Sequence, residues 1–192
     1  MPTESLETFA TDYYQRFAAA VAAFDKAPIQ DVLNIFDQVS AAGGTLYLAG
    51  NGGSAGIADH SVCDISKGTY VEGQVPLRTV SLAANGPILT ALGNDVSYDA
   101  VFSEQLKYYL TEKDALLVVS SSGNSPNVVN AVEYANAKGV PTIAFVGFKG
   151  GKLKEIARHV VHIAADNYGI VEDIHMSLIH CLTQYMKMRA TA

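Results

Sequence analysis

The chain has 192 residues, 49% hydrophobic and 17% charged, which is the composition of a folded globular protein and excludes a disordered one. Its 19 acidic and 13 basic residues give a formal net charge of -6, which argues against a nucleic-acid-binding protein with a basic face. No apolar stretch approaches the ~20 residues that cross a bilayer. The acidic start of the sequence lacks a signal-peptide pattern, so we expect a cytoplasmic protein that binds neither nucleic acid nor membrane.

Apolar residues at helical spacing predict a helix over residues 4–25 and a second helix that begins at Pro28 and ends before Gly43. The first helix carries an aromatic stripe, which we expect to pack against another element or another subunit. From residue 45 onward, predicted strands alternate with predicted helices. The strands are expected at 45–49, 78–82, 115–119, 142–146 and 159–163. The helices are expected from the turn at 50–54 to about residue 67, and at 83–92, 98–110, 127–137, 152–157 and 170–188.

This alternation predicts an α/β fold, a three-layer αβα sandwich with a central five-stranded parallel sheet. We expect one domain over residues 1–192, with a helical extension at about 1–43. The low fraction of charged residues also indicates that part of the surface is covered in an oligomer. Cys63 and Cys181 each fall within a helical pattern, so we expect two small buried side chains and no disulfide.

The apolar run at 45–49 ends in a glycine-rich turn, and a helical pattern follows at once. The turn consists of Gly50, Asn51, Gly52, Gly53 and Ser54. A strand, a glycine turn and a helix often bind phosphate, because glycines let the backbone approach an anion and the helix N-terminus offers free N–H groups. The turn matches neither the Walker A sequence nor G-x-G-x-x-G in register. By itself it is equally consistent with a tight turn that binds nothing.

A second loop of this kind follows the apolar run at 115–119, and Pro126 stands where the next helix would begin. Its hydroxyl side chains include Ser120, Ser121, Ser122 and Ser125. Alone, these serines also fit an ordinary cluster at a helix N-cap. Because both loops would lie at the carboxyl edge of one sheet, together they predict a phosphorylated ligand.

His60 and Asp64 lie four residues apart on the helix after the glycine turn, so their side chains share one face. This spacing suits two ligands of one metal, or a base and its orienting partner, and it also occurs in ordinary surface contacts. Glu172 and His180 are about two turns apart on the last helix and point roughly the same way, whereas His175 points away from His180. The alternative for this helix is an amphipathic segment with acidic residues in its first turn, although imidazoles among apolar residues need partners.

Asn94 and Asp95 follow Gly93, which we expect to end the preceding helix. In such a loop their side chains would either bind sugar hydroxyls or only cap the helix and form a turn. The spacing alone leaves both interpretations open.

Together these segments resemble the SIS (sugar isomerase) domain family, and within it the phosphoheptose isomerases. The likeness rests on the loops at 50–54, 93–95 and 120–125 and on the closing helix at 172–180, and it covers nearly the whole chain. The resemblance implies a metal-assisted aldose–ketose isomerase that converts sedoheptulose 7-phosphate into D-glycero-D-manno-heptose 7-phosphate. It also implies a homotetramer with sites built across subunits.

The resemblance further implies roles for individual residues. Those implied to bind the substrate are Asn51, Gly52, Gly53, Ser54, Asn94, Asp95, Ser120, Ser121, Ser122, Ser125 and Glu172. The implied ligands of a divalent metal, usually zinc (Zn2+), are His60, Asp64, Glu172 and His180. Asp64 and His180 are the implied catalytic pair, which transfers protons.

Two positions depart from the family pattern, since Asp64 stands where the best-known members carry Glu and Glu172 where they carry Gln. Asp64 is one methylene shorter, and Glu172 adds a carboxylate that would help to neutralise a dication. The chain also lacks the Asp-Arg pair that many members have before the last helix. Two alternatives stay open, an isomerase of a different sugar phosphate and a non-catalytic SIS module that binds a sugar phosphate or a protein partner.

Overall fold

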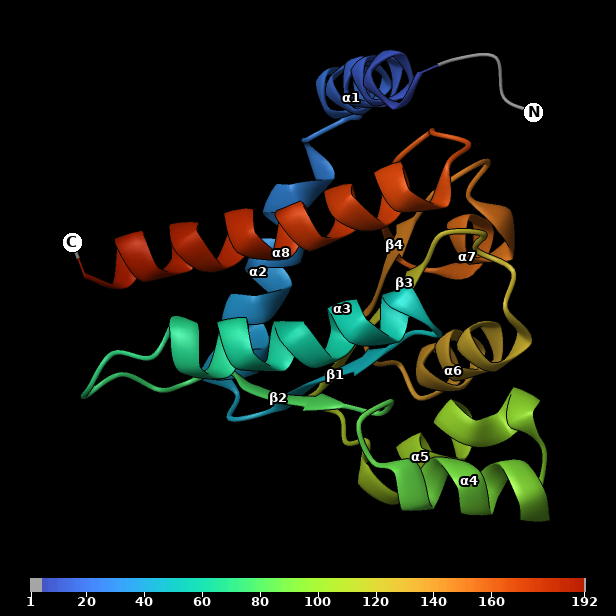
Figure 1. The fold of residues 1–192 in the computed structure, drawn as a ribbon. Helices are drawn as coiled ribbons and strands as arrows, with labels where there is room; N and C mark the ends of the chain where they lie inside the picture. Colours follow the sequence, from blue (N-terminus) through green and yellow to red (C-terminus); the bar gives the residue numbers. More distant parts are fainter. Residues whose placement is uncertain (1–4, 192) are drawn as a thin grey trace.

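The structure is a computed structural model that describes residues 5–191. In this part of the chain, parallel strands form one five-stranded sheet in the order β2-β1-β3-β4-β5, and helices cover both faces (Figure 1). The strands are β1 (Thr45–Ala49), β2 (Arg78–Ser81), β3 (Ala115–Ser120), β4 (Thr142–Val146) and β5 (His159–His162). The predicted three-layer α/β sandwich with a five-stranded parallel sheet is therefore confirmed.

Eight α-helices and two shorter helical segments surround this sheet within the described residues. The α-helices are α1 (Leu6–Ala23), α2 (Pro28–Ala41), α3 (Gly53–Val62), α4 (Gly86–Asp95), α5 (Val101–Tyr109), α6 (Pro126–Ala137), α7 (Gly151–Ile156) and α8 (Tyr168–Ala190). A π-helix (Cys63–Gly68) continues α3, and a 3-10 turn (Tyr98–Ala100) precedes α5. Residue 4, where the first helix was predicted to begin, lies outside the described residues.

The strands are buried on both faces, so neighbouring residues in one strand contribute to different cores. In β1, Leu46 and Leu48 pack in a core with α2, α3 and α8. Tyr47 and Ala49 pack in the opposite core with helices α4 to α7. This two-sided burial explains why the strands are short continuous apolar runs and not alternating ones.

The sheet order brings the two predicted loops together. The chain passes from β1 to β2 on one side and then crosses to β3 on the other, so β1 and β3 are neighbours. Ala49 at the end of β1 pairs with Val118 near the end of β3. Ligands of open α/β sheets bind at the carboxyl edge where the connections diverge in this way.

Helix α1 lies across the end of the molecule beside α8 (Figure 1). Tyr13 and Phe17 of its aromatic stripe pack against the core, as predicted, and Arg16 pairs with Asp166 at 2.9 Å. Leu6 and Phe9 are exposed.

Two local predictions are wrong. Helix α4 continues through Gly93 to Asp95, because one glycine is tolerated in a helix and the N–H of Val96 still donates to the Leu92 carbonyl at 3.0 Å. Asn94 and Asp95 are therefore helical and not in a loop. Cys63 and Cys181 are exposed instead of buried, because each lies on the outer side of its helix; both are free thiols.

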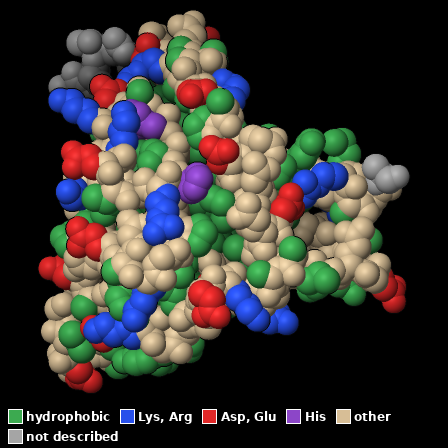
Figure 2. All heavy atoms as spheres, turned by 180° about the vertical axis from the view of Figure 1, so that it is seen from behind, with side chains coloured by type: hydrophobic (Ala, Val, Ile, Leu, Met, Phe, Trp, Pro, Cys, Tyr) green, Lys and Arg blue, Asp and Glu red, His purple; other side chains and the backbone are tan. Residues whose placement is uncertain are grey.

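None of the helices within residues 5–191 is both long and apolar enough to cross a membrane. Figure 2 shows the molecule from behind, where Lys and Arg side chains are interspersed with Asp and Glu.

Candidate active site

The glycine turn connects β1 to α3 and gives other groups close access to the N-terminus of α3. Gly52 has φ +53°, which favours glycine. A Cβ on Gly53 would lie 2.6 Å from the carboxyl carbon of Glu172, so only a glycine lets this side chain from α8 approach. The first N–H groups of an α-helix have no intrahelical partners and are available to other groups at this end of α3.

The serine loop between β3 and α6 offers hydroxyl groups that make few hydrogen bonds within the protein. Ser125 is the N-cap residue of α6, yet its side chain makes no capping hydrogen bond. The Ser121 hydroxyl is buried and has no hydrogen-bond partner among the described residues. A buried hydroxyl without a partner costs about 1–3 kcal/mol, so this group is suited to a ligand.

The two loops enclose a pocket of about 280 Å³. Its lining includes Asn51, Gly52, Gly53, Ser54, Ser120, Ser121, Ser122, Ser125, Tyr168 and Glu172. Helices α3, α6 and α8 all begin at this pocket. Three helix N-termini with partial positive charge, together with several hydroxyls, form a favourable environment for a phosphate group.

Glu172 lies in this pocket, on the first turns of α8. Burial, followed by the neighbouring Asp173, raises the pKa of its carboxyl above the usual value. Glu172 is not part of the cluster formed by the other three predicted metal ligands. The structure therefore brings Glu172 to the phosphate-type pocket and does not bring it to the candidate metal site.

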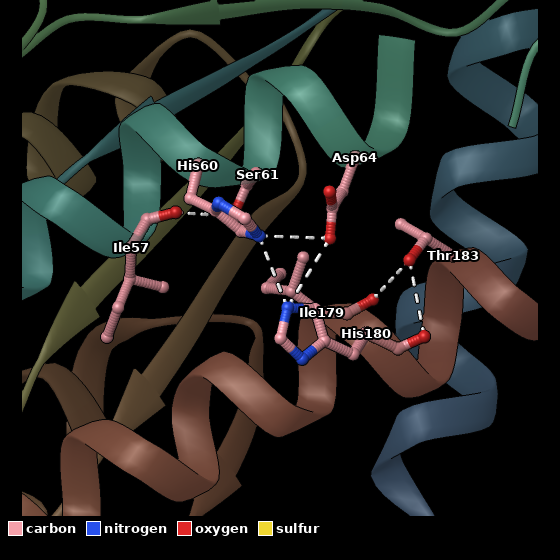
Figure 3. Close-up of polar contacts among 7 residues, drawn as sticks. All are labelled: Ile57, His60, Ser61, Asp64, Ile179, His180 and Thr183. Atoms are coloured by element: carbon pink, nitrogen blue, oxygen red, sulfur yellow. Dashed lines mark hydrogen bonds and ion pairs between the residues drawn. The ribbon is translucent and has the colours of Figure 1, made fainter. Parts of the chain in front are cut away.

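The second part of the site is the cluster of His60, Asp64 and His180, which point toward one another from two helices (Figure 3). His60 Nε2 lies 3.2 Å from Asp64 Oδ2 and 3.2 Å from His180 Nε2. His180 Nε2 lies 3.6 Å from the same carboxylate oxygen. His60 belongs to α3, Asp64 to the π-helix and His180 to α8, so the predicted shared face of His60 and Asp64 is confirmed.

The spacing of these atoms fits a zinc ion. Ligand nitrogens and oxygens at about 2.0–2.1 Å from a tetrahedral zinc lie about 3.3 Å from one another. The three separations of 3.2, 3.2 and 3.6 Å are close to that value. Two imidazoles and one carboxylate are also typical zinc ligands, and three protein ligands leave a fourth position open, as in catalytic zinc sites.

Helices α3 and α8 run side by side in the same direction and connect the pocket to this cluster (Figure 1). Gly53 meets Glu172 at one end of the pair, and His60 meets His180 further along. The seven residues from Gly53 to His60 correspond to about 10 Å along the helix axis. The pocket and the cluster therefore lie at the two ends of about 10 Å of this helix pair.

His175 belongs to the core and not to the site. It is fully buried beside Phe145, and neither ring nitrogen makes a hydrogen bond of normal geometry within the described chain. Burial is the main cause that lowers the pKa of this imidazole to about 4, so it is neutral at pH 7.

Asn94 and Asp95 are not brought to the pocket within this chain. Their side chains bond to each other at 2.7 Å, and α4 packs on the opposite face of the sheet from α8.

The sequence analysis did not identify Tyr168, which lines the pocket. It also missed Asn127, which pairs with Asn51 behind the pocket. The sequence signal that could have identified Asn127 was its position two residues after Ser125, which places it next to the serine loop.

The sequence matches the SIS domain family over residues 11–147. It is 36% identical to a probable phosphoheptose isomerase of Thermoplasma acidophilum, over 80% of this chain and 86% of that protein. It is 33% identical to the phosphoheptose isomerase of a Synechocystis species, over 93% of each. The fold matches that of a phosphoheptose isomerase from Neisseria gonorrhoeae with a TM-score of 0.87 at 26% identity, covering 96% of this chain and all of the other.

The family match extends over more than half of the chain, and two relatives more than 30% identical each cover most of it. The fold, with its two loops at the carboxyl edge, agrees with both findings. The chain therefore belongs to the SIS domain family and is a sugar-phosphate isomerase.

Proposed function

We propose that this isomerase is metal-assisted and interconverts sedoheptulose 7-phosphate and D-glycero-D-manno-heptose 7-phosphate. The observation that carries the proposal is the convergence of His60, Asp64 and His180 along a helix pair whose other end borders a hydroxyl-lined pocket. The names of the relatives support the same substrate.

The phosphate is assigned to the pocket between the glycine and serine loops. Ser121 has a buried hydroxyl without a partner, and Ser125 has a hydroxyl that its helix does not use. Hydrogen bonds from such groups to a phosphate contribute about 1.5–3 kcal/mol each because the acceptor is charged. Binding at this end fixes the reacting carbons at the other end of the sugar.

The distance between the proposed phosphate pocket and the His60–Asp64–His180 cluster supports a substrate with a long sugar chain. Single bonds of about 1.5 Å with tetrahedral angles advance about 1.25 Å per bond, so eight bonds from phosphorus to C1 of a heptulose 7-phosphate span about 10 Å. The helix rise from Gly53 to His60 has the same length, about 10 Å. A pentulose 5-phosphate is two bonds shorter and would not reach both ends equally well.

Asp64 and His180 are the proposed proton-transfer pair. Asp64 Oδ2 faces the imidazoles, while Oδ1 has no partner among the described residues and is free to accept the proton from carbon. His180 Nδ1 likewise has no hydrogen-bond partner among the described residues and is available to exchange a proton with the sugar oxygens. Thr183 hydrogen-bonds the backbone carbonyl of His180 and so helps to hold this turn of α8 (Figure 3).

The proposed metal is zinc, held by His60, Asp64 and His180. A divalent metal at this position, when bound, supplies a Lewis acid that stabilises negative charge on the substrate oxygens. Glu172 was predicted as a fourth ligand; its carboxylate lies in the pocket instead, where its charge opposes that of the phosphate.

We also propose a cytoplasmic homotetramer. The exposed apolar side chains of α1, such as Leu6 and Phe9, support a subunit contact at this helix. In such an assembly Asn94 and Asp95, which are distant from the pocket of their own chain, are available to the substrate of a neighbouring subunit.

The test is turnover on a panel of five-, six- and seven-carbon ketose phosphates, with and without a chelator. We expect the heptulose phosphate to be preferred and the chelator to remove activity. Asp64→Asn should lower kcat by a factor of roughly 10² or more, since proton transfer contributes that much, while phosphate binding and the circular-dichroism spectrum stay unchanged. Glu133→Gln, which alters an exposed carboxylate on α6, is the matched control.

Full activity of Asp64→Asn would refute its assigned role. Turnover of a shorter ketose phosphate alone would change the substrate. Phosphate binding without turnover of any ketose phosphate would favour a non-catalytic SIS module.

A further inference from the structure

Two side-chain amides behind the pocket form a reciprocal pair. Asn51 Nδ2 donates to Asn127 Oδ1 at 2.8 Å, and Asn127 Nδ2 donates to Asn51 Oδ1 at 2.9 Å. The two residues are 76 positions apart in the sequence. Asn127 is only 1% exposed and does not line the pocket, whereas Asn51 does.

The orientation of both amides is determined by their neighbours. The backbone N–H of Val128 donates to Asn127 Oδ1 at 3.0 Å, which requires an oxygen at that position. Asn51 then follows from Asn127 through their reciprocal bonds, and the Tyr98 hydroxyl donates to Asn51 Oδ1 at 3.0 Å in that orientation. A rotation of either amide by half a turn would bring two donors, or two acceptors, against each other.

The pair connects the two loops that form the phosphate pocket. Asn51 belongs to the glycine turn before α3, and Asn127 belongs to the first turn of α6, directly after the serine loop. Both positions lie within three residues of pocket hydroxyls, Ser54 on one side and Ser125 on the other. Two hydrogen bonds from the buried Asn127 amide to the part-buried Asn51 hold such segments more rigidly than exposed contacts do, because breaking them leaves the Asn127 amide unpaired.

We propose that Asn127 is a positioning residue of the isomerase: through Asn51, and with Tyr98, it sets the separation of the glycine and serine loops to that of one phosphate group. This inference rests on the proposed phosphate site. Asn127 acts without touching the substrate. Its loss should therefore weaken phosphate binding, and so raise KM, more than it lowers kcat, because the phosphate is remote from the reacting carbons.

The experiment measures the dissociation constant for inorganic phosphate by calorimetry, together with KM and kcat for the ketose phosphate. Asn127→Leu removes both amide bonds and keeps the same number and branching of side-chain heavy atoms. Asn127→Asp keeps the acceptor for Asn51 and Val128 and loses the donor. We expect both to raise the phosphate dissociation constant and KM about tenfold, with kcat changed less than about threefold.

Asn136→Leu is the matched control. Asn136 lies in the last turn of α6 and donates to the Ile156 carbonyl at 2.8 Å, so this variant removes a side-chain hydrogen bond from the same helix without touching Asn51 or the turn that carries Tyr98. It should leave phosphate affinity unchanged. Tyr98→Phe removes only a hydroxyl from an exposed ring and should weaken phosphate binding about threefold.

Wild-type phosphate affinity in folded Asn127→Leu and Asn127→Asp would overturn the inference, as would an equal loss in Asn136→Leu. If neither Asn127 variant folds, Tyr98→Phe decides, and unchanged affinity in that variant overturns it. A wild-type protein that binds phosphate but isomerises no ketose phosphate would refute the proposed function alone, since the calorimetric series still tests the amide pair.

Discussion

The Ser121 hydroxyl allows a test in which stability and ligand affinity change in opposite directions. The side chain is 4% exposed, lines the phosphate pocket and has no hydrogen-bond partner within the described chain. Ser121→Ala removes this hydroxyl and little else. In the phosphate-free protein the substitution therefore removes an unpaired buried polar group instead of a favourable contact.

The expected magnitudes follow from this burial. An unpaired buried hydroxyl costs about 1–3 kcal/mol, so Ser121→Ala should raise the free energy of unfolding by about 1 kcal/mol. For a chain of this length the melting temperature should rise by roughly 2–4 °C. When phosphate is bound, the lost hydrogen bond to a charged acceptor contributes about 1.5–3 kcal/mol, which corresponds to a loss of affinity of roughly tenfold to a hundredfold.

Urea unfolding without ligand and calorimetric titration with inorganic phosphate measure the two effects. Ser61→Ala is the control, because the buried Ser61 hydroxyl donates to the Ile57 carbonyl at 2.6 Å and lies outside the pocket. That variant should lose about 1 kcal/mol of stability and keep its phosphate affinity. A destabilised Ser121→Ala with unchanged phosphate affinity would show that the hydroxyl is paired in the free protein and does not bind the anion.

Two further predictions concern titratable groups on α8. Glu172→Gln removes a negative charge from the pocket assigned to phosphate. Like charges at contact in a solvent-like dielectric repel by about 1 kcal/mol, so calorimetry should show phosphate affinity about fivefold higher. A loss of bound zinc would instead identify Glu172 as a metal ligand. His175 has a folded-state pKa of about 4. Between pH 6.5 and 4 the unfolded chain therefore binds a proton that the folded protein excludes, and the free energy of unfolding should fall by about 3 kcal/mol as the pH drops across this window. Urea titrations at several pH values should show this fall in the wild type and a smaller one in His175→Leu; equal slopes would mean that the folded protein accommodates the charged ring.

The sequence by itself determined the elements whose signals are local. Continuous apolar runs identified the strands, because a strand of a parallel sheet is buried on both faces and needs no alternation. The glycine turn and the serine loop were recognised because each directly follows such a run. The four-residue spacing of His60 and Asp64 placed them on one helix face, and the structure has their side chains 3.2 Å apart.

The end of α4 could not be predicted reliably from the sequence, because a glycine such as Gly93 weakens a helix without always ending it. Cys63 and Cys181 were predicted to be buried, and both are exposed. A helical pattern shows that a residue belongs to a helix, but the packing of neighbouring elements decides which of its borderline residues are covered.

Only the tertiary structure decided which residues share a site. His60 and His180 are 120 positions apart, and they meet because α3 and α8 pack side by side in the same direction. The same packing brings Glu172 against Gly53, into the pocket between the two loops and not into the His60–Asp64–His180 cluster, although Glu172 had been predicted to share a ligand set with His180. The pairing of Asn51 with Asn127 has no periodic signature at all. Such contacts depend on the relative positions of whole elements, which are set by burial of the two cores and not by the residues that meet.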